Sequence, residues 1–177
     1  EFFTVFATQN PIEFEGTYPL PEAQLDRFLL KIRITYPETD QEIQILENHH
    51  HGFDSHHLEA VEIASLPTEI LAQARDEVRR TTVEPALFRY MVELVRRTRD
   101  WPSLAMGASP RAAISLMMVA KAAAALEERD YLIPDDVKSA VLPVLRHRVM
   151  MKPEAELEGQ DSDQVLNEII NSVEVPK

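Results

Sequence analysis

The pattern of hydrophobic and polar positions changes once along this chain, near residue 39. Before that point, residues 2–8 form a nearly continuous apolar and β-branched run, and residues 29–36 (LLKIRITY) carry apolar side chains at alternate positions. Both patterns predict strands, and the first is typical of a strand buried on both faces of a parallel sheet. Two strands cannot bury their faces alone, so we expect them to need partner strands that this sequence does not supply.

From residue 39 onward the apolar positions follow a helical period. Proline or a capping residue marks several helix starts, and Pro143 should kink or restart the helix that contains it. The Ala- and Met-rich helix over 110–129 is apolar on most sides, so we expect it to be central and buried. The predicted helices cover residues 40–48, 68–81, a segment from Pro85, 110–129, a segment from Asp135, and 161–172.

These elements predict a mainly α protein in three parts. Residues 1–38 are the end of an α/β core with two parallel-sheet strands, and residues 39–150 form an all-helical bundle. Residues 151–177 form an acidic C-terminal tail with a short helix, because residues 154–177 hold seven acids against Lys177 alone.

Composition narrows the class of protein. The chain has 177 residues, a formal net charge of −12 and no cysteine. The negative charge argues against a nucleic-acid surface, and the absence of cysteine excludes disulfides and thiolate metal sites. No apolar run approaches the roughly 18 to 20 residues that a membrane span requires. We therefore expect no membrane insertion and a cytoplasmic location.

Asn10 follows the first predicted strand directly. Ligands of open parallel sheets bind at the carboxyl ends of the strands. Pro11 favours an extended conformation at Asn10, so the carboxamide can project beyond the sheet and orient a water or contact a phosphate oxygen. The ordinary alternative for an Asn-Pro pair is an Asx-type turn.

Two arginines are candidate anion contacts. Arg27 follows a short helix that begins at Pro21, and it either pairs with Asp26 on the surface or reaches a phosphate across a subunit boundary. Arg111 lies in the first turn after Ser109-Pro110, where its charge opposes the helix dipole. The free amides of that turn and the guanidinium together suit an anion, and the alternative is an ordinary salt bridge.

The histidines give weaker evidence for a functional site. Five of the six histidines lie within nine residues (His49, His50, His51, His56 and His57), and imidazole suits zinc, nickel or copper. No cysteine or clear carboxylate set accompanies them, so we expect no physiological metal site. The GxxxxGK[ST] phosphate loop is absent from the sequence.

Four segments resemble the MoxR family of AAA+ ATPases. They are ATQNPIEFEGTYPLPEAQLDRFLLKI at 7–32, VRRTR at 95–99, GASPRAA at 107–113 and RDYLIPDDVKSAVLPVLRHR at 129–148. Their order and approximate spacing match the family across nearly the whole chain. One departure is Glu128, where many relatives have glycine.

The resemblance implies a role for each candidate residue. Asn10 is expected to be the first sensor, which positions the attacking water, and Arg27 the arginine finger, which reaches the nucleotide of the neighbouring subunit. Arg111, with Ser109 and Pro110, is expected to be the second sensor, and the bundle is the AAA+ lid.

The resemblance also implies cofactors and partners. The intact parent is expected to bind ATP and Mg²⁺, to form a homo-oligomeric ring with six subunits, and to remodel or mature a client protein. The family's phosphate loop and acidic magnesium strand precede Asn10 and are absent from this sequence. We therefore expect the 177 residues alone to be inactive and to bind no cofactor tightly.

Two alternatives remain open. A non-catalytic helical adaptor derived from an AAA+ lid would share the bundle but have no ATPase upstream. A His-rich metal-binding domain would bind zinc through His49, His50 and His51.

Overall fold

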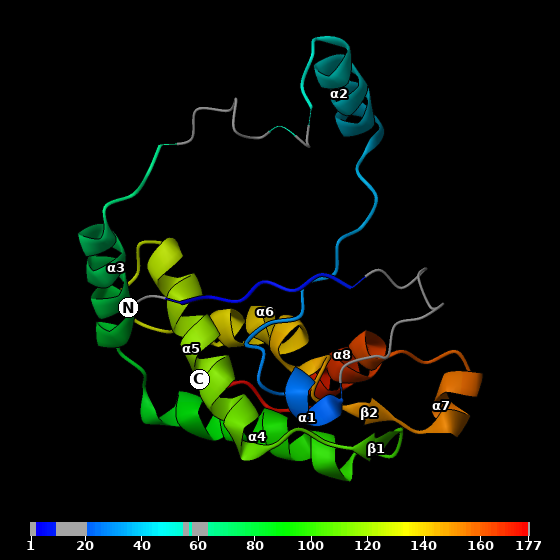
Figure 1. Cartoon of the computed structure of the whole chain (residues 1–177). Coiled ribbons are helices and arrows are strands. Elements are labelled where there is room, and N and C mark those ends of the chain that lie inside the picture. Colours follow the sequence, from blue (N-terminus) through cyan, green and yellow to red (C-terminus); the bar gives the residue numbers. More distant parts are fainter. Residues whose placement is uncertain (1–2, 10–20, 55–56, 58–63, 177) are drawn as a thin grey trace.

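The computed structural model describes residues 3–9, 21–54, 57 and 64–176 (Figure 1). The chain is mainly helical with one small sheet, which confirms the predicted fold class. No described helix is long and apolar enough to cross a membrane. The elements are α1 (Glu22–Leu25), α2 (Thr39–His50), α3 (Thr68–Arg80), α4 (Pro85–Asp100), β1 (Leu104–Met106), α5 (Pro110–Leu126), α6 (Pro134–Leu145), β2 (Met150–Met151), α7 (Pro153–Leu157) and α8 (Ser162–Ser172).

The core lies among α4, α5, α6 and α8. Helix α5 packs against α3, α4 and α6, and α8 packs against α4 and α6. One face of α4 is buried, as its helical period predicts, and its apolar residues are Leu87, Tyr90, Met91, Leu94 and Val95. Leu94, Leu116, Val141 and Leu166, one from each helix, are fully buried. Burial of these apolar side chains therefore stabilises the four helices as one body.

Helix α5 is central but is not buried on all sides. Its small residues Ala112, Ala120 and Ala124 are fully buried, and small side chains allow neighbouring helices to approach closely. Its opposite face is open, with Ile114 58% and Met118 52% exposed. The expectation of an apolar helix enclosed on most sides was therefore wrong for this face.

Helix α8 belongs to the core, although the sequence placed it in an acidic tail. Asp161 caps its start, because the Asp161 carboxylate accepts the Gln164 amide at 2.8 Å. Val165, Leu166 and Ile169 are buried against α4 and α6. Glu168, the one acidic residue between them, is exposed, so its charge does not prevent the packing of this segment. The segment after residue 150 therefore contributes a helix to the core.

The two predicted N-terminal strands are not formed in the described residues. Residues 3–9 and 29–36 carry no strand, and Ile34 and Phe6 are each 92% exposed. A strand needs a neighbouring backbone to complete its hydrogen bonds, and none of the described residues supplies one. The backbone of residues 28–31 instead bonds to α6 and to the residues that follow it.

The small sheet joins two distant parts of the chain. Strands β1 and β2 are antiparallel, with Leu104 opposite Met151 and Met106 opposite Met150. The Lys152 amide also donates to the Ser103 carbonyl at 2.9 Å. The sheet therefore fixes the segment after α6 beside the loop that leads into α5.

Helix α6 continues through Pro143 and ends at Leu145, so the proline does not restart the helix. The Pro143 carbonyl accepts the Lys31 amide at 2.8 Å. This hydrogen bond gives the proline region a second role, because it docks the N-terminal segment onto α6.

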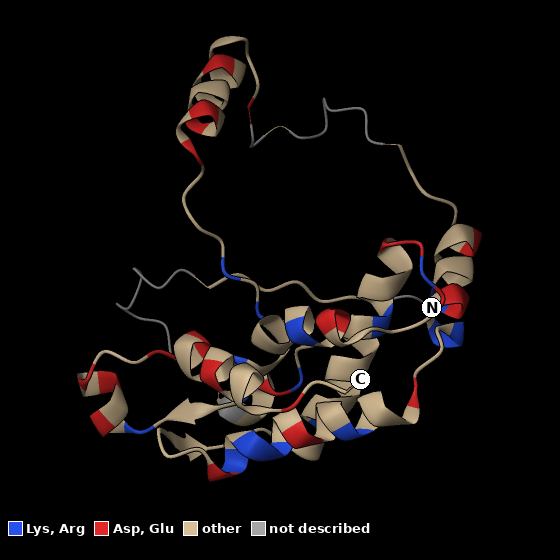
Figure 2. Cartoon of the chain, turned by 180° about the vertical axis from the view of Figure 1, so that it is seen from behind, with Lys and Arg blue, Asp and Glu red and all other residues tan. Residues whose placement is uncertain are grey.

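Helix α2 stands apart from the helical body in both views (Figures 1 and 2). The helix forms as predicted, but none of its residues is buried. Ile43, Ile45 and Leu46 are 49%, 57% and 70% exposed, so the expected inward face has no cover from the described residues.

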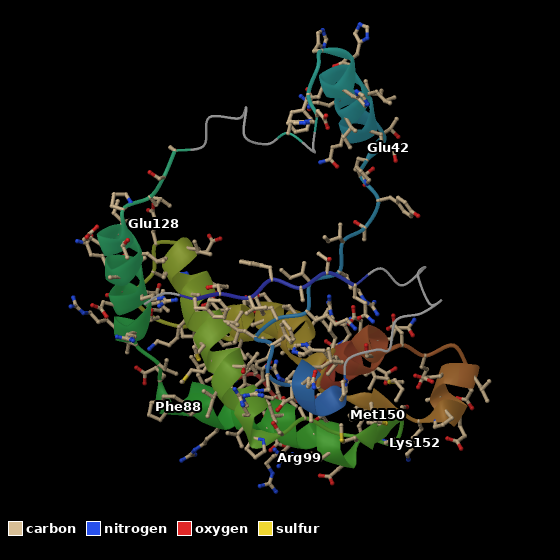
Figure 3. The ribbon with its side chains drawn as sticks, viewed as in Figure 1. Glu42, Phe88, Arg99, Glu128, Met150 and Lys152 are labelled. Atoms are coloured by element: carbon tan, nitrogen blue, oxygen red, sulfur yellow. The ribbon has the colours of Figure 1, made fainter. Side chains whose placement is uncertain are left out.

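Glu128 ends helix α5 in a conformation that favours glycine. Its φ angle is 57°, in the left-handed region. The Glu128 amide donates to the Ala125 carbonyl at 3.0 Å, and the Arg129 amide donates to the Ala124 carbonyl at 2.9 Å. This pair of bonds is the Schellman motif, whose left-handed position is usually glycine. Figure 3 labels Glu128 at the end of α5. Because many members of the family that the chain resembles have glycine here, the glutamate adds strain that those relatives avoid.

We predict that Glu128→Gly stabilises the protein. Glycine removes the steric cost of the left-handed conformation, which is about 1 kcal/mol. Urea unfolding followed by circular dichroism should show a higher midpoint with an unchanged slope. The matched control is Glu127→Gly, because Glu127 has a φ angle of −89° and should lose stability. Equal changes in both variants would contradict the explanation.

Candidate functional site

The described candidate residues gather where α1 meets the start of α5. Arg27 follows α1, and its amide donates to the Gln24 carbonyl at 3.2 Å. The Ser109 hydroxyl lies 3.5 Å from Oδ2 of Asp26, the residue that precedes Arg27. The structure therefore brings Ser109, Pro110 and Arg111 next to the Arg27 segment, although more than eighty positions separate them in the chain. Asn10 lies outside the described residues.

Arg27 and Arg111 both extend into solvent. Each is exposed, and neither forms an ion pair with a residue in the described ranges. The ordinary alternative for Arg27 was a surface pair with Asp26. Asp26 instead pairs with Arg148, whose Nε lies 3.0 Å from the carboxylate. The guanidinium groups of Arg27 and Arg111 are thus available for an external anion.

A close contact between α4 and the loop before α5 fixes the position of Ser109 and Arg111. The Thr98 hydroxyl, which is fully buried, accepts the Ala108 amide at 2.9 Å, and Arg99 Nε donates to the Ala108 carbonyl at 3.0 Å. A Cβ atom on Gly107 would lie 2.6 Å from the backbone of Thr98 and Arg99. Only glycine allows this approach, so the two motifs VRRTR and GASPRAA are in direct contact.

The start of α5 is open to a negatively charged group. Ser109 is the N-cap residue, but its side chain makes no capping hydrogen bond. The first turn contains Arg111 and no acidic residue. Pro110 has no N–H and the Ala112 amide donates to the Ser109 carbonyl at 3.0 Å. The Arg111 amide, the helix dipole and the Arg111 charge are therefore the features that favour an anion.

Three consecutive basic residues after α6, Arg146, His147 and Arg148, hold the segment that follows Arg27. We name them the basic clasp. Arg146 Nη1 donates to the Lys31 carbonyl at 3.3 Å, and His147 Nε2 donates to the Phe28 carbonyl at 3.0 Å. The sequence alone assigned no role to Arg148. The one sequence signal was its place in the RDYLIPDDVKSAVLPVLRHR segment.

His147 is buried and uncharged in this arrangement. Because the Phe28 carbonyl accepts from Nε2, this nitrogen carries the proton, and Nδ1 is buried without a hydrogen-bond partner among the described residues. Burial lowers the pKa of His147, and the charges of Arg148 and Lys31 lower it further. The Phe28 carbonyl and Asp26 oppose this change without reversing it.

An ion pair orients the start of α6. Arg129 contacts both carboxylate oxygens of Asp136, with Nη2 to Oδ1 at 2.5 Å and Nη1 to Oδ2 at 2.8 Å. The same carboxylate accepts the Ile133 amide at 2.9 Å. Although burial raises the pKa of Asp136, the hydrogen bonds from Arg129 and Ile133 outweigh it and hold the pKa below its usual value.

The histidine cluster is split between α2 and the loop after it. His49 and His50 end α2, His51 Nδ1 bonds to the Glu47 carbonyl at 2.7 Å, and His57 Nδ1 pairs with Asp54 at 2.8 Å. No group of three or more His, Cys, Asp or Glu side chains suited to a metal ion occurs within the described residues.

Two family models match the chain. One described as "AAA lid domain" matches residues 96–169, and one described as "ATPase family associated with various cellular activities (AAA)" matches residues 1–30. The first range runs from α4 to α8 and includes the basic clasp. The second includes Asn10 and Arg27.

The chain is also similar to curated and solved proteins. It is 44% identical to the uncharacterized protein YeaC of Bacillus subtilis over 98% of this chain and 53% of that protein. It is 36% identical to chaperone MoxR1 of Mycobacterium tuberculosis over 99% of this chain and 47% of that protein. It is 32% identical to protein MoxR of Methylorubrum extorquens over 96% of this chain and 53% of that protein. A crystal structure of a Cytophaga hutchinsonii protein assigned as an ATPase matches with a TM-score of 0.81 and 34% identity, over 96% of this chain and 53% of that one.

The helical body and the two AAA matches define the chain as part of an AAA+ ATPase. Within that class it belongs to the MoxR type, since relatives named MoxR align with nearly its whole length. The chain spans about half the length of the curated relatives it matches.

We predict that His147 makes stability depend on pH. Its pKa is lower in the folded state than in the unfolded state, so below about pH 6.5 the unfolded chain takes up a proton first. The contribution is present above that pH and is lost as the pH falls toward the folded pKa.

Urea unfolding at pH 7.5 and 5.5 measures this effect. His147→Gln should reduce the loss of stability between the two values, because glutamine retains a donor without titrating. The matched control is His51→Gln at an exposed position, which should retain the wild-type pH dependence. Equal pH dependence in wild type and His147→Gln would contradict the assignment.

Proposed function

We propose that this chain supplies the sensors, the arginine finger and the lid of a MoxR-type AAA+ ATPase. Arg27 acts as the finger on the nucleotide of a neighbouring subunit, and Asn10 positions the attacking water. Arg111, with Ser109 and Pro110, senses the nucleotide at the start of α5. Residues 1–38 complete the α/β core, and the helices from residue 39 onward form the lid.

The observation that supports this proposal most is that the two arginines are available to an external ligand. Arg27 and Arg111 are exposed and lack ion-pair partners within the described residues, while the adjacent Asp26 is engaged by Arg148. A planar guanidinium can contact two phosphate oxygens at once. Holding such groups in place before the reaction is how phosphoryl-transfer enzymes stabilise developing charge.

The residues present fit part of an ATP site. Arg27, Arg111 and the Arg111 amide in the first turn of α5 suit phosphate oxygens, but no described cluster of acidic side chains suits Mg²⁺. The sequence also lacks the GxxxxGK[ST] motif. We propose that a phosphate loop and a magnesium-binding strand precede this segment in the complete protein.

The finger role requires a neighbouring subunit, so we propose a homo-oligomeric ring, with six subunits as the expected number. Hydrolysis in this ring would drive remodelling or maturation of a client protein in the cytoplasm. The relative named chaperone MoxR1 supports a chaperone-like activity.

In the complete protein, Arg27→Ala should lower ATP turnover by about 10³- to 10⁵-fold, the usual contribution of an arginine finger. ATP binding, measured by calorimetry, should remain. The matched control is Arg33→Ala on the same segment, because the half-exposed Arg33 side chain pairs with Asp161 and Asp163 at the start of α8 and has no role at the proposed nucleotide site. Turnover that survives Arg27→Ala would refute the finger assignment.

The 177-residue chain alone should neither hydrolyse ATP nor bind it tightly, because the phosphate loop supplies most phosphate contacts. A coupled assay for released phosphate measures this directly. Turnover by the purified chain that is abolished by Asn10→Ala would contradict the prediction.

The competing function is a non-catalytic adaptor. The exposed apolar residues of α2, Ile43, Ile45 and Leu46, favour a contact with another protein. The sequence upstream of Glu1 distinguishes the two functions. An in-frame GxxxxGK[ST] followed by a strand that ends in acidic residues favours the ATPase, and its absence favours the adaptor.

A further inference from the structure

Arg148 binds the segment around Arg27 through its whole guanidinium group. Its side chain is 1% exposed. Nε donates to Oδ1 of Asp26 at 3.0 Å, and Nη2 donates to the carbonyls of Phe28 at 2.6 Å and Asp26 at 3.2 Å. Nη1 donates to the Leu29 carbonyl at 3.2 Å. One buried side chain thus fixes the backbone on both sides of Arg27.

Arg148 also contacts the lid helices α5 and α6. Nη1 also donates to the Val144 carbonyl at the end of α6, and Nη2 lies 3.4 Å from the Ser115 hydroxyl on α5. A buried guanidinium loses its hydration, so these acceptors are needed to stabilise its charge. A lysine could not reach the same acceptors, because it carries one ammonium group in place of a planar fork.

Asp26 connects this anchor to the start of α5. One carboxylate oxygen pairs with Arg148, and the other lies 3.5 Å from the Ser109 hydroxyl. Arg27 is the next residue after Asp26, and Arg111 is two residues beyond Ser109. Burial lowers the pKa of Arg148, and Asp26 opposes this shift. The charge of Arg111 lowers the pKa further. Asp26, Arg111 and Arg148 are therefore electrostatically coupled, and Ser109 lies beside Asp26.

We propose that Asp26 and Arg148 are positioning residues that hold Arg27 in a fixed place relative to the start of α5. The inference rests on the proposed function, in which Arg27 and Arg111 contact nucleotides. Neither Asp26 nor Arg148 touches the nucleotide, and both act through Arg27. A movement of α5 that follows the nucleotide bound at Arg111 is transmitted to Arg27 through the Ser109–Asp26–Arg148 contacts.

Hydrogen exchange on the 177-residue chain tests the docking without reference to ATP. The Lys31 amide, which donates to the Pro143 carbonyl, is the reporter, and nuclear magnetic resonance resolves it individually. Asp26→Asn and Arg148→Lys should each accelerate its exchange by about tenfold or more, since each removes a charged hydrogen bond. Amides in α4 should be unchanged.

The matched control is Arg97→Gln. Arg97 forms an exposed pair with Glu93 on α4, with both side chains about half exposed, and its removal should leave the Lys31 amide unaffected. Because Arg148 is buried, Arg148→Lys could disturb folding. Asp26→Asn is the second variant, since Asp26 is 31% exposed and asparagine has the same shape.

Steady-state kinetics of the complete protein test the positioning role. Asp26→Asn should lower kcat roughly 10- to 100-fold with KM for ATP nearly unchanged, because a displaced finger affects only the transition state. In an Arg27→Lys background, Asp26→Asn should cause little further loss. A merely structural role would lower kcat independently of the residue at position 27.

The outcomes separate this inference from the proposed function. Unchanged Lys31 exchange in both variants overturns the docking role. Accelerated exchange with unchanged kcat, in an active protein, overturns the positioning role. A complete protein without any ATPase activity overturns the proposed function, and the positioning role with it, while the exchange result for the docking stands.

Discussion

Burial of the Arg148 guanidinium is the constraint on which the placement of the candidate site depends. The charge is stabilised by the Asp26 carboxylate and by the carbonyls of Asp26, Phe28 and Leu29. A segment that makes no strand in the described residues is therefore held against α6 by side chains instead of a sheet. Arg146 and His147 extend the same contact to Lys31 and Phe28.

The other side of the site depends on a close approach between backbones. Gly107 lies so close to Thr98 and Arg99 that a side chain cannot be accommodated, and Thr98 directs the loop into α5. The motifs VRRTR and GASPRAA are thus two halves of one contact. Together with the basic clasp, this contact places Ser109 beside Asp26 and leaves Arg27 and Arg111 in solvent. The site is buried and hydrogen-bonded where it is anchored, and exposed where it would meet a ligand.

Local sequence signals predicted the helices well and the strands poorly. Pro85 and Pro110 mark the first residues of α4 and α5, and the three- and four-residue spacing on α4 identified its buried face. A helix forms its own hydrogen bonds, so nearby residues carry most of the information. Residues 29–36 have a strand pattern, but a strand needs a partner backbone, and the described residues supply none. The acidity of residues 154–177 likewise concealed the buried face of α8.

The sequence by itself determined the MoxR resemblance, the helical periods and the identity of Arg27 and Arg111 as candidates, because motifs and periods are properties of neighbouring residues. Asn10, outside the described residues, stays a prediction. Only the tertiary structure decided that Asp26 pairs with Arg148 instead of Arg27, and that α8 completes the core. Asp26 and Arg148 lie 122 positions apart, and α8 packs against two earlier helices of the chain. The energy of both contacts comes from burying charge and apolar surface that no local pattern records.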